Sequence, residues 1–204
     1  MGFLNNIKDS VIILLLGVAA IIIDTKNPDV VKWVRIIYYG IHAINLIAIL
    51  IVHINILVKG QKEKFTYTRI TSVLGAAAGE GEVKVISIPI AEYDLIQKNA
   101  LLRSNLIILV ILTITHVLFG WTKPLLLQVY FPLKLLLIHP LFRVHLLQRE
   151  AKGNLARPWD MYYRIPLSTI GDVIRERPTI PRDIKKQKKE SMKQSGEKSK
   201  LKRK

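Results

Sequence analysis

The side chains with the most evident chemistry in this sequence are five histidines, all of which lie in or beside apolar segments. Histidine binds metals and transfers protons, but either role needs partner residues at a suitable spacing. No His-Glu-x-x-His motif occurs, no acidic residue lies within an apolar run, and His139 and His145 are six residues apart, a poor spacing for ligation from one helix face. The sequence therefore predicts no metal centre, no cofactor site and no enzyme active site.

A second set of polar residues follows the period of a helix. Residues 36–58 form an apolar run long enough to cross a bilayer. Within it, Tyr38, His42, Asn45 and His53 fall within about 80° of one another on the helix surface. We call these four residues the polar stripe. Polar groups in hydrocarbon need protein or water as partners, so the stripe is expected to face a helix-bundle interior or a wet groove. Alternatively, its side chains form only the interhelical hydrogen bonds that hold a bundle together.

Lys134 is unusual because it lies near the middle of the apolar segment 125–147. Pro132 and Pro140 interrupt helical hydrogen bonding in this segment. Two interpretations remain open. The segment returns through the membrane with Lys134 facing the interior, or it lies broken at the interface with its cations reaching water. In the first interpretation a hydrophilic groove is lined by Tyr38, His42, Asn45, His53, His116 and Lys134.

The elements that position these residues are predicted from composition and apolar runs. The chain has 204 residues, 50% of them hydrophobic, a net charge of +16 and no cysteine, which favours one small membrane domain with a basic appendage. Apolar runs at 11–23, 36–58 and 106–121, with the segment 125–147, predict an all-α integral membrane protein with three or four transmembrane helices over residues 1–148. The first run is short, at roughly 20 Å against a hydrocarbon core of roughly 30 Å.

Residues 59–104 are predicted to form a loop outside the membrane. Threonine, aromatic and β-branched residues on both sides of Gly79 and Gly81 predict a small β-hairpin with these glycines in its turn. From Glu92 a helical pattern extends the third apolar run. With four crossings, this loop and the C-terminal tail share the cytosolic side, according to the positive-inside rule. With three crossings, they lie on opposite sides.

The tail, residues 149–204, carries 17 Lys and Arg against 7 Asp and Glu. It is predicted to be cytosolic and disordered from about residue 183, because few apolar side chains remain there. Dense basic residues bind ribosomal RNA or an anionic leaflet through their charge, although simple solvation is the alternative. The candidate contacts are Lys185, Lys186, Lys188, Lys189, Lys193, Lys198, Lys200, Lys202, Arg203 and Lys204.

An ordered set of motifs resembles a known family. GEGE, then EYDL at the start of a helix, then KPLLLQ, FPLK and FRVHLLQREAKGNLARPW occur between Gly79 and Trp159. Their order and spacing resemble the fungal endoplasmic-reticulum family described as SRP-independent (SND pathway) targeting protein three, earlier named inorganic phosphate transport protein eighty-eight. The resemblance covers most of residues 1–160.

The resemblance implies a multi-pass protein of the endoplasmic-reticulum membrane, with a cytosolic C-terminus, that targets and inserts membrane proteins independently of signal recognition particle. The implied partners are membrane lipids, the Sec translocon, the ribosome, other SND-pathway components and nascent membrane-protein clients. A hydrophilic groove fits an insertase because a polar client flank must find partners while it crosses. Two alternatives stay open: a transporter or transport-maturation factor for phosphate or another small anion, and a membrane scaffold that tethers ribosomes.

Overall fold

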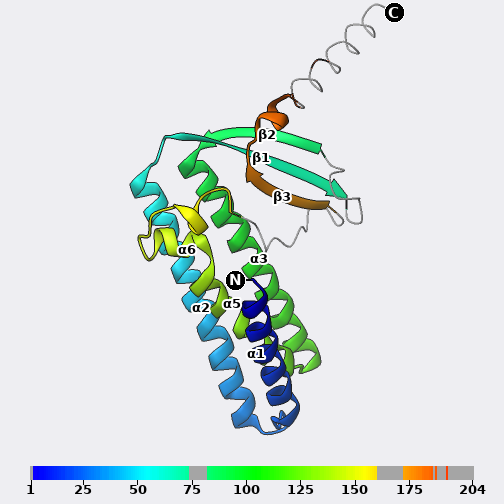
Figure 1. Ribbon diagram of the computed structural model, residues 1–204. Helices are drawn as coiled ribbons and strands as arrows, with labels where there is room; N and C mark the ends of the chain where they lie inside the picture. The colour runs from blue at the N-terminus through cyan, green and yellow to red at the C-terminus, as the bar shows by residue number, and fades with distance from the viewer. Residues whose placement is uncertain (1, 74–81, 160–171, 186, 188–191, 193–204) are drawn as a thin grey trace, which may run out of the picture. The chain divides into compact units, whose positions relative to one another are not determined.

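The computed structural model describes residues 2–73, 82–159, 172–185, 187 and 192. The chain forms two compact units. The helical unit contains Met1–Asn55 and Lys98–Arg149, and the sheet unit contains Ile56–Gln97 and Glu150–Lys204. Two long helices, α2 (Pro28–Lys59) and α3 (Ile90–Phe119), contribute residues to both units (Figure 1).

The ends of α2 and α3 follow from capping residues in the sequence. Asn27 caps α2, since its Oδ1 accepts a hydrogen bond from the backbone N–H of Asp29 at 2.9 Å. Gly60 follows the last residue of α2 with a φ of +49°, and Gly120 follows α3 with a φ of +67°. Glycine adopts this left-handed conformation without the strain that a Cβ would bring. Both long helices therefore end where the sequence allows the chain to turn.

The segment after α3 forms three short helices, α4 (Lys123–Gln128), α5 (Tyr130–Ile138) and α6 (Pro140–His145). The breaks follow from the prolines. Pro132 has no N–H to offer the carbonyl of Gln128, and Pro140 is the first residue of α6. His139 caps α6, because its Nδ1 accepts a hydrogen bond from the Leu141 N–H at 3.2 Å.

These short helices run alongside α2 in the same direction. Val34 and Tyr38 near the start of α2 pack with Leu125 of α4. Further along, Asn45 Nδ2 donates to the carbonyl oxygen of Pro132 at 2.9 Å. Near the end of α2, Asn55 Nδ2 donates to the His145 carbonyl oxygen at 2.8 Å. The partner numbers rise together, so α4, α5 and α6 return the chain along α2.

The expectation of three or four transmembrane helices is wrong. Within the described residues, α2 and α3 are the two helices long and apolar enough to cross a membrane. The apolar part of α1 (Gly2–Ile22) extends only from Ser10 to Ile22, and α4, α5 and α6 contain 6, 9 and 6 residues. The fourth predicted helix fails because Pro132 and Pro140 break it, and the first because charged Lys8 and Asp9 shorten its apolar length.

The expectation of an all-α fold is also wrong. The predicted hairpin exists as β1 (Lys64–Val73) and β2 (Glu82–Pro89), but it is part of a larger antiparallel sheet. The third strand, β3 (Asp172–Pro178), comes from the basic tail and pairs with the other edge of β1, which gives the order β2-β1-β3. The turn that contains Gly79 and Gly81 lies outside the described residues.

The sheet unit has an aromatic core on the face of the sheet that packs on α3. Tyr67 of β1 and Tyr93 of α3 are fully buried, with ring centroids 5.3 Å apart. Phe65 stacks on Tyr67, and the ring centroids of Trp159 and Tyr93 lie 5.8 Å apart. Trp159 follows a short 3-10 helix, η1 (Gly153–Leu155), and its indole Nε1 donates to the Leu155 carbonyl at 2.9 Å. These rings bury much apolar area in a small unit.

The tail continues past β3 into a helical turn at residues 181–185. Most of the stretch predicted to be disordered, from about residue 183, lies outside the described residues, so the disorder stays a prediction. Asp183 is buried and accepts hydrogen bonds from Thr68 Oγ1 at 3.0 Å, Arg177 Nη2 at 2.7 Å and the Ile180 N–H at 3.1 Å. Burial acts to raise the pKa of Asp183, but these hydrogen bonds and the charge of Arg177 outweigh it and hold the pKa below its ordinary value. One carboxylate thus ties the turn to β1.

This shift predicts that acid weakens the sheet unit. The folded pKa of Asp183 lies below its unfolded value of about 3.9, so its contribution is complete above that pH and is lost as the pH falls through the folded pKa. Hydrogen-exchange protection of β1 and β3 should therefore fall as the pH drops below about 4, and less steeply in Asp183→Asn. Equal pH dependence in both proteins would contradict the assignment.

Candidate functional site

The polar stripe lies on the side of α2 that packs against α4 and α5. Tyr38, His42 and Asn45 are 0%, 3% and 1% exposed, and His53 is half-buried. The Tyr38 and His42 rings lie 4.5 Å apart, and Asn45 holds the Pro132 carbonyl through its amide nitrogen. The structure therefore places three of the four stripe residues together inside the helical unit.

The stripe carries buried polar atoms that lack hydrogen-bond partners. Within the part of the chain that the structure describes, this holds for Tyr38 Oη, His42 Nε2, Asn45 Oδ1 and His53 Nδ1. Gln128, the last residue of α4, adds its Oε1 to the set. A buried polar atom without a partner typically costs about 1–3 kcal/mol, so five such atoms in one helical unit are unusual.

The other two predicted groove residues have different surroundings. His116 of α3 is buried, its Nε2 accepts from Arg35 Nε at 2.8 Å, and its Nδ1 lies 3.2 Å from the Trp121 carbonyl oxygen. Lys134 is half-buried in α5, with its Nζ 5.8 Å from the centroid of the Tyr130 ring. Both ring nitrogens of His116 are thus engaged by neighbours, unlike those of the stripe. Their role as groove lining stays a prediction.

Of the basic residues predicted to contact an anionic surface, Lys185 is described and exposed at the end of the helical turn. The other nine lie outside the described residues: Lys186, Lys188, Lys189, Lys193, Lys198, Lys200, Lys202, Arg203 and Lys204. Among the residues that the structure does describe, no three His, Asp or Glu side chains gather as ligands for a metal ion.

The structure joins two motifs that the sequence did not connect, EYDL at the start of α3 and the Arg157-Pro158-Trp159 segment. Asp94 of EYDL accepts hydrogen bonds from both Nε and Nη2 of Arg157, at 2.7 Å from Nε, and the two side chains are 1% and 10% exposed. In addition, the Trp159 N–H donates to Tyr93 Oη at 2.8 Å. The residues at the start of α3 therefore hold the Arg157-Pro158-Trp159 segment. The sequence offered one signal for this contact: EYDL contains an acidic residue, Asp94, and the motif that ends at Trp159 contains a basic one, Arg157.

Sequence reasoning also missed a buried carboxylate at the centre of the sheet unit. Glu176 Oε1 accepts from Arg69 Nε at 3.0 Å and Nη2 at 2.8 Å, whereas Oε2 accepts from Tyr93 Oη at 3.3 Å and Gln97 Nε2 at 3.2 Å. These contacts join β3 to β1 and to α3.

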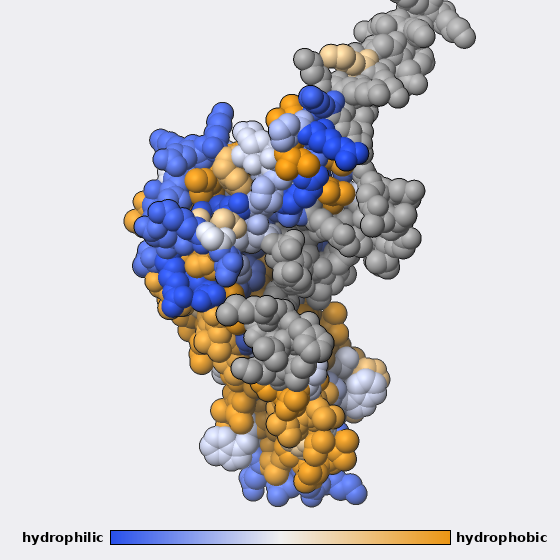
Figure 2. All heavy atoms as spheres, in the orientation of Figure 1, coloured by the Kyte–Doolittle hydropathy of each residue, from blue (hydrophilic) through white to orange (hydrophobic). Residues whose placement is uncertain are grey.

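The surface of the helical unit is apolar over much of its length. Figure 2 shows hydrophobic residues over the visible helices and hydrophilic residues gathered at the end that holds the connection from α1 to α2. In the most apolar 18-residue stretches of α2 and α3, only 33% and 22% of the residues are buried, respectively. Large exposed apolar surfaces of this kind mark contact with a membrane or a partner protein.

Comparison with known proteins decides the family. The family model described as phosphate transport (Pho88) matches residues 4–201, nearly the whole chain. The chain belongs to the Pho88 family. The resemblance seen in the motifs is therefore confirmed, and the match extends through β3 and the helical turn of the tail.

The Pho88-family chain is similar to two proteins from yeasts. It is 27% identical over 137 residues to SRP-independent targeting protein 3 of Saccharomyces cerevisiae, an alignment that covers 67% of this chain and 71% of the relative. It is also 23% identical over 137 residues to an uncharacterized protein of Schizosaccharomyces pombe, covering 67% of this chain and 66% of that protein. No solved structure matches the chain significantly.

Proposed function

We propose that this Pho88-family protein targets membrane proteins to the endoplasmic reticulum independently of signal recognition particle, and that it assists their insertion through the polar stripe. The name of the Saccharomyces cerevisiae relative supports the targeting role. The observation that carries the insertion role is the set of buried, unpartnered polar atoms inside an apolar helical unit. A polar client flank that crosses a bilayer needs such partners.

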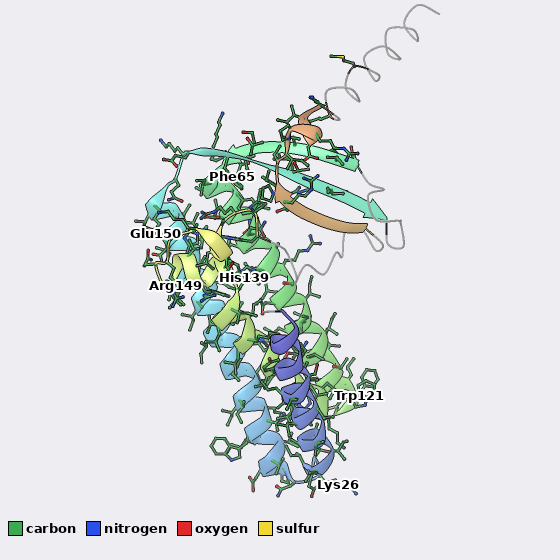
Figure 3. The ribbon with its side chains drawn as sticks, viewed as in Figure 1. Lys26, Phe65, Trp121, His139, Arg149 and Glu150 are labelled. Atoms are coloured by element: carbon green, nitrogen blue, oxygen red, sulfur yellow. The ribbon has the colours of Figure 1, made fainter. Side chains whose placement is uncertain are left out.

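A membrane location accounts for the surface of the helical unit. In this proposal α2 and α3 cross the bilayer, and their exposed isoleucine, leucine and valine side chains contact lipid. Trp33 and Trp121 are exposed, as expected for aromatic residues at a membrane interface. Trp121 lies at the same end of the helical unit as Lys26, away from His139 and Arg149 (Figure 3).

The sheet supports a common side for the loop and the tail. Because β1 and β2 follow α2, and β3 belongs to the tail, pairing of all three strands requires both segments on one side of the membrane. With α2 and α3 across the bilayer, the tail reaches that side only if α4, α5 and α6 bring the chain back along α2, and their contacts with α2 support this return. That side also carries the 17 basic residues of the tail, so the positive-inside rule makes it the cytosol. There the tail would meet the ribosome, the Sec translocon and other components of the SND pathway.

Site-specific photocrosslinking tests the insertion role. A photoreactive residue at His53 or Lys134 should crosslink to the transmembrane segment of a client during its translation into microsomes. The matched control is Ile54, which neighbours His53 on α2 but is 51% exposed, and Leu15 of α1 is a second control at 62%. Crosslinks to the client should be at least several-fold stronger from the two test positions. Equal yields at all four positions would remove the insertion role.

Phosphate transport is the second candidate function, because the description of the family names it. In that case His42, His53 and Lys134 would supply the donors that an anion needs. Replacing His42 and His53 by leucine would then reduce phosphate uptake and leave client crosslinking from Lys134 unchanged. The insertion role predicts the reverse pattern.

A further inference from the structure

The unpartnered atoms of the stripe have a common chemical character. Asn45 Nδ2 donates to the Pro132 carbonyl, which fixes the orientation of the amide and leaves Oδ1 as the unpartnered atom. An amide oxygen only accepts hydrogen bonds. The unpartnered atom of Gln128 is likewise its amide oxygen, Oε1. Two of the atoms in this set therefore require a donor.

The remaining unpartnered atoms can also accept a hydrogen bond. Tyr38 Oη both donates and accepts, and an imidazole nitrogen such as His42 Nε2 accepts when it carries no proton. Tyr38, His42 and Asn45 are almost fully buried. Among the described residues with unpartnered buried atoms, none is a lysine or an arginine. These side chains therefore offer hydrogen-bond acceptors.

Helix geometry brings Gln128 to the stripe. Gln128 lies three residues after Leu125, which packs with Tyr38, and four before Pro132, whose carbonyl binds Asn45. Residues three and four apart share one helix face, and Val129 keeps helical dihedral angles between α4 and α5. Gln128 therefore projects from the α4–α5 face that packs against Tyr38 and Asn45.

We propose that Tyr38, His42, Asn45 and Gln128 form a binding site for hydrogen-bond donors, which selects client flanks rich in hydroxyl, amide or backbone N–H groups over flanks rich in carboxylates. This inference rests on the proposed insertion role for its biological setting. A carboxylate at the site would face two amide oxygens and lose its hydration. A serine hydroxyl or an amide N–H would satisfy the same oxygens.

A binding experiment tests the preference without relying on insertion. The full-length protein, purified in detergent micelles, is titrated at pH 8 with two fluorescent peptides that share one hydrophobic segment and differ in a four-residue flank. The flank contains serine and asparagine in one peptide and four glutamates in the other. We expect the serine-asparagine peptide to bind about tenfold more tightly, which corresponds to one or two hydrogen bonds.

Charge variants at Gln128 provide the decisive comparison. Gln128→Lys adds a donor with a positive charge and should reverse the preference toward the glutamate peptide, whereas Gln128→Glu should strengthen the original preference. The matched control is Leu127→Lys, which places the same charge on the exposed neighbour and should leave the ratio of the two affinities unchanged. Equal binding of both peptides, or the same change in ratio from Leu127→Lys, would overturn the proposal.

Insertion of the same two flanks into microsomes separates this proposal from the proposed function. If depletion of the protein slows insertion but the purified protein binds both peptides equally, the donor site is excluded and the insertion role stands. If the purified protein prefers the serine-asparagine peptide but its depletion leaves insertion unchanged, the donor site stands and the insertion role fails.

Discussion

Arg157→Ala should lower the free energy of unfolding of the sheet unit by about 3–5 kcal/mol, since the change leaves the carboxylate of Asp94 buried without its ion-pair partner. The Asp94 side chain is 1% exposed, so its charge is largely removed from water in the folded protein. The change also removes the Arg157 side chain from the Trp159 ring, which it covers at 4.8 Å from the centroid. Chemical denaturation in detergent, followed by hydrogen exchange in β1, measures the loss.

Lys152→Ala is the matched control for this prediction. The Lys152–Glu150 pair has a similar N–O distance of 2.7 Å, but its side chains are 82% and 75% exposed. Solvent screens such a pair, and its removal should cost no more than about 1 kcal/mol. If Arg157→Ala were as mild as Lys152→Ala, the ion pair between EYDL and the Arg157-Pro158-Trp159 segment would have no special structural role.

Glu176→Ala should have an effect of similar size, about 3 kcal/mol, but located at β3. The substitution removes the acceptor of Tyr93 Oη and Gln97 Nε2, two buried donors that typically cost about 1–3 kcal/mol each when left unsatisfied. It also removes the partner of Arg69, whose side chain is 25% exposed and therefore loses less. Hydrogen exchange should show lost protection along β3 while the β1–β2 pairing persists.

Glu82→Ala serves as the control for Glu176→Ala. Glu82 pairs with Lys84 at 3.0 Å, and both side chains are more than half exposed. The control tests whether loss of any glutamate from the sheet loosens it. Uniform loss of protection in all three strands after Glu176→Ala would show that β3 is not a separable element and would contradict the prediction.

The elements with long local patterns were predictable. The apolar lengths of α2 and α3 and the paired threonine-rich and valine-rich segments of β1 and β2 are each visible in a short window of sequence. β3 was not, because Arg175, Glu176 and Arg177 resemble a solvated tail. Burial of Glu176 depends on its donors Arg69, Tyr93 and Gln97, and Arg69 lies 107 positions earlier in the chain.

The candidate site also has a part that could be predicted from the sequence and a part that could not. The helical period predicted that Tyr38, His42 and Asn45 share one face, and the structure places these three together. The contribution of Gln128 could not be predicted, because it depends on the pairing of Asn45 with Pro132 and of Tyr38 with Leu125. Such pairings fix the relative register of two segments that lie far apart in sequence, and no local period encodes it.

The strand order β2-β1-β3 also determines when each strand of the sheet can pair during synthesis. β1 and β2 leave the ribosome early, whereas Asp172–Pro178 follows only after α3, α4, α5 and α6 have been made. Until then one edge of β1 has backbone N–H and C=O groups without a strand partner, and such edges invite pairing with other chains. Completion of the sheet therefore reports that the whole intervening helical segment has been synthesised, and a chain that stops before Asp172 would keep an open edge.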